Sequence, residues 1–151
     1  MPTVKTEVIK DGVLNSFLYN LYTASKDGRS STGNGVRGSY RTIPRVAPLN
    51  LYVKPGTRKD EEIIKSVEKG IYVFSLIGTH LINPVSGNFS IGANGLLIEK
   101  GELTNPVAEI TLVGNIKDLL LNVGEASSKL AFMGTVSSPL IRIDEVMVSS
   151  Q

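Results

Sequence analysis

Side chains that could bind a peptide or move a proton are concentrated in one segment, residues 78–107. The segment contains the only histidine of the chain, together with five glycines and four asparagines. His80 is the only candidate general base, because imidazole is the side chain whose ordinary pKa lies near neutrality. The nearby amides and hydroxyls could donate and accept hydrogen bonds with a bound peptide. The candidates of this kind are Asn83, Ser86, Asn88, Ser90 and Asn94.

Two interpretations of these polar residues stay open. An extended peptide could be held by main-chain hydrogen bonds at a strand edge, a mode that tolerates many peptide sequences. Alternatively, the same side chains hydrogen-bond only within their own loop, as polar loop residues commonly do. Thr79 and Leu81 give His80 no catalytic triad, and the surrounding turns prevent a spacing argument for a base beside Ser86 or Ser90. We therefore predict no catalytic residue in this chain.

The carboxylates have structural explanations rather than catalytic ones. Glu61 and Glu62 fall where acidic side chains favour the positive N-terminal end of a helix, and Asp118 occupies the third position of another. None of these residues forms a convincing pair of carboxylates for acid–base chemistry. The sequence therefore predicts that they stabilise helices.

The composition also bears on metal chemistry and on the class of protein. The chain has 151 residues, one histidine and no cysteine, so disulfides and thiolate zinc ligands are excluded. A self-contained transition-metal site needs several nitrogen or sulfur ligands, and we predict no metal ligand here. With 41% hydrophobic and 20% charged residues and no long apolar run, the chain is expected to be cytoplasmic, with no membrane span.

Positive charge is concentrated between Lys26 and Arg45. This stretch carries five cations against one anion, whereas the whole chain has a formal net charge of only +2. It is either a solvated loop or a surface that faces an anion. The candidates for anion contact are Arg29, Arg37, Arg41 and Arg45.

Three segments have the apolar spacing and end signals of helices. The first begins with a cap at Asn15 or Ser16 and stops at Asp27–Gly28. The second is capped by Thr57 and closed by Gly70, and the third begins at Asn115 and is closed by Gly124.

Strands and turns account for most of the remaining chain. We expect a strand over residues 4–14 around a turn at Asp11–Gly12, a buried strand over residues 71–77, and a strand over residues 108–112. Residues 78–107 are expected to form a long loop, which includes Asn83 to Gly95, followed by a tight hairpin. The turn signals in this segment are Asn83–Pro84, Ser86–Gly87, Asn94–Gly95 and Lys100–Gly101. Two short strands follow Pro139. The fold class predicted is α+β, a mostly antiparallel sheet that is curled or barrel-like, with two or three short helices in a single domain over residues 1–151.

Several motifs resemble one known family. The segment Asn83–Val107 has the form NPxSGxFSxGAxGxxIExGExxxPV, which closely resembles the signature of the TldD/PmbA family. Further motifs resemble the C-terminal domain of the same family in the same order along the chain. They are Gly12–Leu14, Ser31–Arg37 (STGNGVR), Pro48–Leu51, Lys54–Gly56, Ile110–Leu120 and Ser138–Ile141.

The resemblance implies a zinc-dependent peptidase system that acts on unfolded peptides. Catalytic members hold zinc with an HExxxH helix and a cysteine of the C-terminal domain, and this chain contains neither. The resemblance is therefore closer to the PmbA-like (TldE) half, with zinc expected only in a catalytic TldD-like partner. It also implies that a long N-terminal region is absent and that the chain is a fragment with an exposed sheet edge where the preceding strand would pair.

Two other functions stay open. Family members are named modulators of DNA gyrase, which would make the chain a nucleic-acid-associated regulator. Only the basic stretch supports that function, and Tyr40 alone offers a stacking ring there, so we do not expect nucleic acid as a partner. The second is a structural domain that uses its edge and loops for assembly or self-association, without affinity for unfolded peptides.

Overall fold

The computed structural model describes residues 4–149 of the chain, and these divide into two compact units. Unit 1 comprises Met1–Tyr52 and Phe132–Ser137, and unit 2 comprises Val53–Ala131 and Ser138–Gln151.

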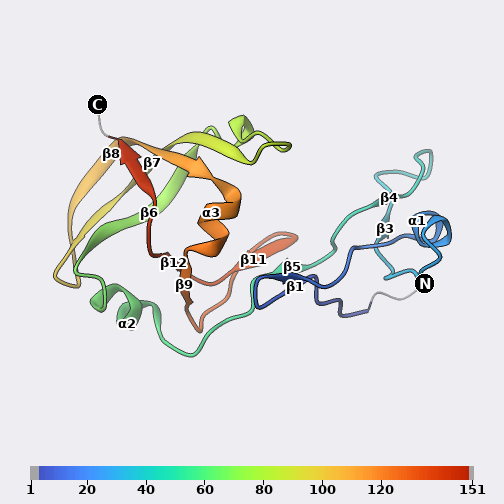
Figure 1. The fold of residues 1–151 in the computed structure, drawn as a ribbon, viewed down its shortest axis with the longest axis horizontal. Helices are drawn as coiled ribbons and strands as arrows, with labels where there is room; N and C mark the ends of the chain where they lie inside the picture. Colours follow the sequence, from blue (N-terminus) through green and yellow to red (C-terminus); the bar gives the residue numbers. More distant parts are fainter. Residues whose placement is uncertain (1–3, 150–151) are drawn as a thin grey trace. The chain divides into compact units, whose positions relative to one another are not determined.

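A four-stranded antiparallel sheet organises unit 2 (Figure 1). Its strands are β6 (Lys69–Ile77), β7 (Asn88–Glu99), β8 (Glu102–Asn115) and β13 (Met147–Ser149), in the order β13-β8-β7-β6. The turn between β7 and β8 is tight, because Lys100 and Gly101 both take positive φ values, 51° and 79°. The long strands β7 and β8 curve in Figure 1, and within the described residues the sheet stays open at β6 and β13.

The core of unit 2 lies on one face of this sheet. Alternate residues of β7 are buried, with Phe89 and Ile91 each 5% exposed and Ala93 fully buried. This period of two is what a half-buried strand requires. Helix α2 (Asp60–Lys65) adds Ile63, which is 2% exposed.

A smaller sheet in unit 2 pairs β9 (Val123–Ala126) with β12 (Ile141–Ile143). Glu125 lies between two arginines, with its carboxylate 2.9 Å from the Arg58 guanidinium and 3.8 Å from that of Arg142. The segment before α2 runs beside the end of β9, where the Gly56 N–H donates to the Ser127 carbonyl at 2.9 Å. Ser127 is completely buried, and its hydroxyl accepts from the Leu140 N–H at 3.1 Å.

Unit 1 is built from short elements. Two hairpins pair β1 (Ile9–Lys10) with β2 (Val13–Leu14) and β3 (Gly35–Val36) with β4 (Arg45–Val46). Helix α1 (Leu21–Lys26) begins after Asn20, whose Oδ1 accepts from the Thr23 N–H at 2.8 Å. A third sheet has the order β10 (Ala131–Met133), β11 (Val136–Ser138), β5 (Leu51–Tyr52), and its β11–β5 pair is parallel.

The interior of unit 1 is small and largely polar. Ala24 is its buried apolar residue among those described, whereas Asn20 and Asn34 are 6% and 8% exposed. Each asparagine satisfies its buried amide, since Asn20 Nδ2 donates to the Pro44 carbonyl and Asn34 Nδ2 to the Ala47 carbonyl, both at 3.2 Å.

The predicted fold class is confirmed: the sheets are mostly antiparallel, and three short α-helices accompany them. The third, α3 (Ile116–Leu121), begins after Asn115 as predicted. The turns at Asp11–Gly12 and Lys100–Gly101 are also confirmed, and β12 and β13 are the two short strands expected after Pro139.

Several predicted boundaries are wrong. The first helix begins at Leu21 rather than near Ser16, because Asn20 and Thr23 form the capping box. The second begins at Asp60 after Lys59, whose N–H donates to Glu62 Oε2 at 3.1 Å. Gly70 does not close it and instead lies within β6. Gly124 likewise lies in β9 rather than closing α3.

The largest correction concerns the predicted loop over Asn83 to Gly95. Its second half, from Asn88 onward, belongs to the 12-residue strand β7. Asn94–Gly95 is a register shift inside the strand rather than a turn. A Cβ at residue 95 would collide with the Tyr72 carbonyl oxygen, so this glycine permits close strand approach. The strand predicted as buried over residues 71–77 is also partly open, with Phe74 63% exposed.

Candidate functional site

The polar loop that remains spans residues 78–87 between β6 and β7. Gly78 starts it at a φ of 79°, followed by a single 3-10 turn, η1 (Thr79–Leu81). The Asn83 carboxamide then closes a turn, since its Oδ1 accepts from the N–H groups of Val85 and Ser86 at 2.9 Å each. This local bonding is typical of asparagine before a proline turn. Asn83 therefore shapes the loop.

Asn115 ties this loop to the start of α3. Its Nδ2 donates to the Ser86 carbonyl at 2.9 Å and to Asn88 Oδ1 at 2.7 Å. Its Oδ1 accepts from the Lys117 N–H at 2.9 Å and so caps the helix. One side chain thus fixes both the loop and the helix, and it accounts for the bonding of Asn88.

Asn94 lies away from this cluster. Six residues along β7 separate it from Asn88, a distance of roughly 20 Å in an extended strand. Its Oδ1 accepts from the Glu109 N–H of β8 at 3.0 Å. The structure therefore brings together Ser86, Asn88 and Asn115, and it places Asn94 elsewhere in the sheet.

His80 and Ser90 differ from the other predicted site residues. Both are exposed, and among the described residues neither side chain takes part in a hydrogen bond. His80 lies in the 3-10 turn and Ser90 on β7, on the face opposite Phe89 and Ile91. They are free to contact a ligand.

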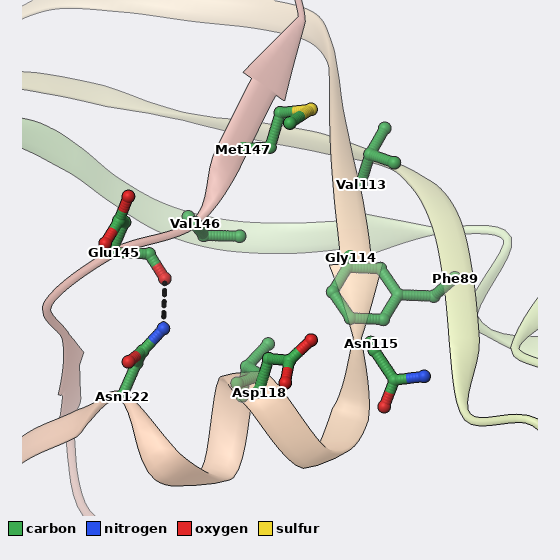
Figure 2. Close-up of a pocket in the computed structure, with 10 residues that line it drawn as sticks. Phe89, Val113, Gly114, Asn115, Asp118, Asn122, Glu145, Val146 and Met147 are labelled. Carbon is green, nitrogen blue, oxygen red and sulfur yellow. Dashed lines mark hydrogen bonds between the residues drawn. The ribbon is translucent and has the colours of Figure 1, made fainter.

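A pocket of roughly 230 Å³ adjoins Asn115 on the core side of the sheet (Figure 2). Its apolar surface includes Phe89 of β7, Leu119 of α3 and Val146 just before β13. Asp118 of α3 and Asn122, the residue that caps the C-terminal end of this helix, contribute polar groups. Asn115 and Glu145 also line the pocket. Figure 2 shows the Asp118 carboxylate rising from α3 toward the space below the Phe89 ring, and the Asn122 amide bonded to the Glu145 carbonyl at 3.3 Å.

Sequence reasoning missed this pocket. It predicted the helix start at Asn115 and placed Asp118 in the first turn, but gave neither residue a role beyond the helix. The i, i+4 spacing of Asp118 and Asn122 is the available signal, because it places both on one helix face. The approach of Phe89 and Val146 is tertiary and has no local signature.

The predicted anion-contact residues lie in unit 1. Arg29, Arg37, Arg41 and Arg45 are all exposed, and no described residue forms an ion pair with them. Arg41 lies 5.1 Å from the centroid of the Tyr40 ring. Nearby, desolvation and then the Asp27 carboxylate raise the pKa of the Tyr19 phenol above its ordinary value, and Arg29 opposes them. The cations therefore remain available to solvent or to an anionic partner.

The described residues do not by themselves fit a zinc site. Across the described residues, no three His, Cys, Asp or Glu side chains lie close enough together to hold a metal ion. The single histidine is exposed, and the sequence has no cysteine. Within residues 4–149, no helix is both long and apolar enough to cross a membrane.

Comparison with known proteins decides the family. The model of the PmbA/TldA metallopeptidase C-terminal domain matches residues 1–150. The chain belongs to the PmbA/TldD family. The matched domain covers both compact units.

Relatives in the PmbA/TldD family include proteins that carry either name. Metalloprotease PmbA of Escherichia coli O157:H7 is 30% identical over 149 residues, covering 99% of this chain and 31% of that protein. A metalloprotease TldD homologue of Haemophilus influenzae is 30% identical, covering 98% and 34%. The chain thus spans about a third of the length of these relatives.

Solved structures from the PmbA/TldD family share the fold. A Thermotoga maritima protein named as a modulator of a DNA gyrase matches with a TM-score of 0.89 and 33% identity. TldE of Thermococcus kodakarensis matches with a TM-score of 0.85 and 29% identity. Each match covers 99% of this chain and 34% of the solved one.

Proposed function

We propose that this chain is the C-terminal domain of a PmbA/TldE-like component of a zinc-dependent peptidase that processes unfolded peptides. It binds the peptide and is not catalytic by itself, and a TldD-like partner subunit supplies zinc and the chemistry in the cytoplasm. The observation that carries the proposal is family membership combined with a chain whose residues do not fit zinc.

Peptide binding is supported by the edges of the four-stranded sheet. Within the described residues, β6 and β13 are each paired on one side only. An outer strand presents unpaired N–H and C=O groups, to which an extended peptide can add by main-chain hydrogen bonds. Exposed apolar side chains accompany both edges, with Leu76 of β6 at 49% and Met147 of β13 at 71%. His80 follows β6 closely, so it is placed to contact a peptide on that edge.

Peptide addition to an edge has a direct test. The full chain is titrated into a fluorescein-labelled, unstructured peptide, and binding is followed by anisotropy. A second peptide of the same sequence is N-methylated on every residue, which removes the N–H donors from both of its edges. The proposal expects the first peptide to bind and the second to bind at least ten-fold more weakly. Equal affinity for both would overturn addition at an edge, and the absence of binding would overturn the peptide function.

The exposed apolar surface of unit 1 supports a second function, assembly with a partner subunit or another copy. Ile43 is 90% exposed, Tyr40 80% and Leu21 69%, and a pocket of roughly 350 Å³ lies between α1 and Pro44. Leu21 and Ile43 both line this pocket, and exposed apolar side chains that lie together often mark a protein–protein contact. Light scattering on the chain and on its Ile43→Asp variant tests assembly. A dimer that dissociates in the variant supports self-association. A monomer in both cases excludes self-association and leaves a different subunit as the partner.

A further inference from the structure

The pocket between α3 and the sheet has an apolar floor and two acidic side chains, Asp118 and Glu145, in its lining. Phe89, Leu119 and Val146 form the apolar part, and Phe89 is only 5% exposed. The Phe89 ring lies against Gly114, where a Cβ would stand 3.1 Å from the ring carbon Cζ. Because residue 114 is a glycine, the Phe89 ring can pack directly against the backbone there. The volume of roughly 230 Å³ suits a single side chain rather than a larger ligand.

Asp118 supplies the charge at this pocket. Among the described residues, no donor bonds its carboxylate, and it takes part in none of the ion pairs. Glu145 also lines the pocket and adds a second exposed carboxylate nearby. Lys117 is the adjacent exposed cation on the helix. Two carboxylates against one ammonium leave the surroundings negative.

The chemistry of this pocket matches one kind of side chain. Lysine and arginine carry an apolar stem that packs on hydrophobic surface and a cationic end that seeks an acid. An aromatic ring beside the carboxylate adds an attraction for a cation. A norleucine-like side chain would leave the Asp118 carboxylate without a partner, and an acidic one would be repelled by it.

We propose that this pocket receives a lysine or arginine side chain of the bound peptide, so that the chain prefers basic unfolded peptides. The inference rests on the proposed peptide-binding function and adds a preference to it. The pocket lies at the start of β13, whose outer edge is unpaired within the described residues. A peptide strand added there places alternate side chains on the face that holds Val146 and Phe89.

The preference is measured with three peptides that are identical except for one central residue, lysine, norleucine or glutamate. Each is titrated with the full chain by fluorescence anisotropy. We expect the lysine peptide to bind on the order of five-fold tighter than the norleucine peptide, the size of an exposed ion pair with a cation–aromatic contact. The glutamate peptide should bind most weakly.

Two variants separate the pocket from general electrostatics. Asp118→Asn should remove the lysine preference. Glu102→Gln, an exposed carboxylate in the β7–β8 hairpin, should keep the preference. Ring-¹³C-labelled phenylalanine gives a local readout, with the Phe89 resonance assigned from Phe89→Leu. The lysine peptide should shift that resonance more than those of the three other phenylalanines.

The outcomes distinguish this inference from the function on which it rests. If the three peptides bind equally, or if Glu102→Gln reduces the preference as much as Asp118→Asn, the pocket inference is overturned and peptide binding stands. If no peptide binds, the peptide function itself fails and the inference fails with it. A lysine preference lost only in Asp118→Asn, together with a Phe89 shift, supports both.

Discussion

Asn94 holds the backbone of Glu109 across two strands. The Asn94 Oδ1 accepts from the Glu109 N–H at 3.0 Å, and Glu109 takes a φ of 56°, a left-handed value that is uncommon for a residue with a side chain. The register between β7 and β8 shifts at this point. Asn94 therefore stabilises an irregularity that the long hairpin contains.

Asn94→Ala should lower the free energy of unfolding by about 1 kcal/mol, because the hydrogen bond to Glu109 is lost. Asn94→Asp keeps an acceptor at the same place and should lose much less. Urea denaturation of the three proteins measures the difference. If the alanine variant is as stable as the parent, Asn94 does not stabilise the register shift and is again a candidate for ligand contact.

Substitution of Asn115 should lower the free energy of unfolding more than substitution of a residue that only caps a helix. Asn115→Ala removes the cap on Lys117 and both ties to the loop, and we expect a loss of about 1–2 kcal/mol. Asn115→Asp retains the cap acceptor but cannot donate to the Ser86 carbonyl. Hydrogen exchange across residues 83–88 should therefore accelerate in both variants. Exchange that accelerates only in the alanine variant would show that the loop does not depend on the Asn115 amide.

Gly56 should not tolerate a side chain. Its N–H bonds the Ser127 carbonyl, and a Cβ there would collide with the Ala126 carbonyl oxygen, which is backbone and cannot turn away. Gly56→Ala should cost about 1–3 kcal/mol, the usual range for overpacking. Gly38→Ala is the matched control, since a Cβ there meets nothing within 4 Å. Thermal melting compares them, and equal melting temperatures would contradict the close approach.

The β7–β8 hairpin should gain stability from a better turn residue. Lys100 takes a φ of 51° beside Gly101, and a left-handed conformation costs a side-chain-bearing residue about 1 kcal/mol or more. Asparagine tolerates this conformation, so Lys100→Asn should add about 0.5 kcal/mol of stability. Lys100→Ala removes the same charge without that tolerance and should give no gain. A gain in both variants would assign the effect to charge instead.

Local signals in the sequence correctly predicted the turns at Asp11–Gly12 and Lys100–Gly101, the fold class and the start of α3. These signals gave wrong predictions where the same type of residue is common both in turns and at close contacts between strands. The dipeptide Asn94–Gly95 is typical of a turn. In the structure a glycine is required at residue 95 because β6 and β7 approach closely at Tyr72, and this approach depends on tertiary packing. Asp118 was correctly placed in a first helical turn. Its place in one pocket with Phe89 and Val146 depends on contacts between segments that are distant in the sequence, and the spacing of apolar residues does not predict such contacts.

The central claim is that this chain binds unfolded peptide without carrying the zinc chemistry. The most direct measurement incubates the full chain with a labelled unstructured peptide, in the presence of zinc and in the presence of a chelator. Anisotropy follows binding, and mass spectrometry follows the peptide. We predict equal affinity under both conditions and an intact peptide throughout. Zinc-dependent cleavage by this chain alone, or no binding under either condition, would contradict it.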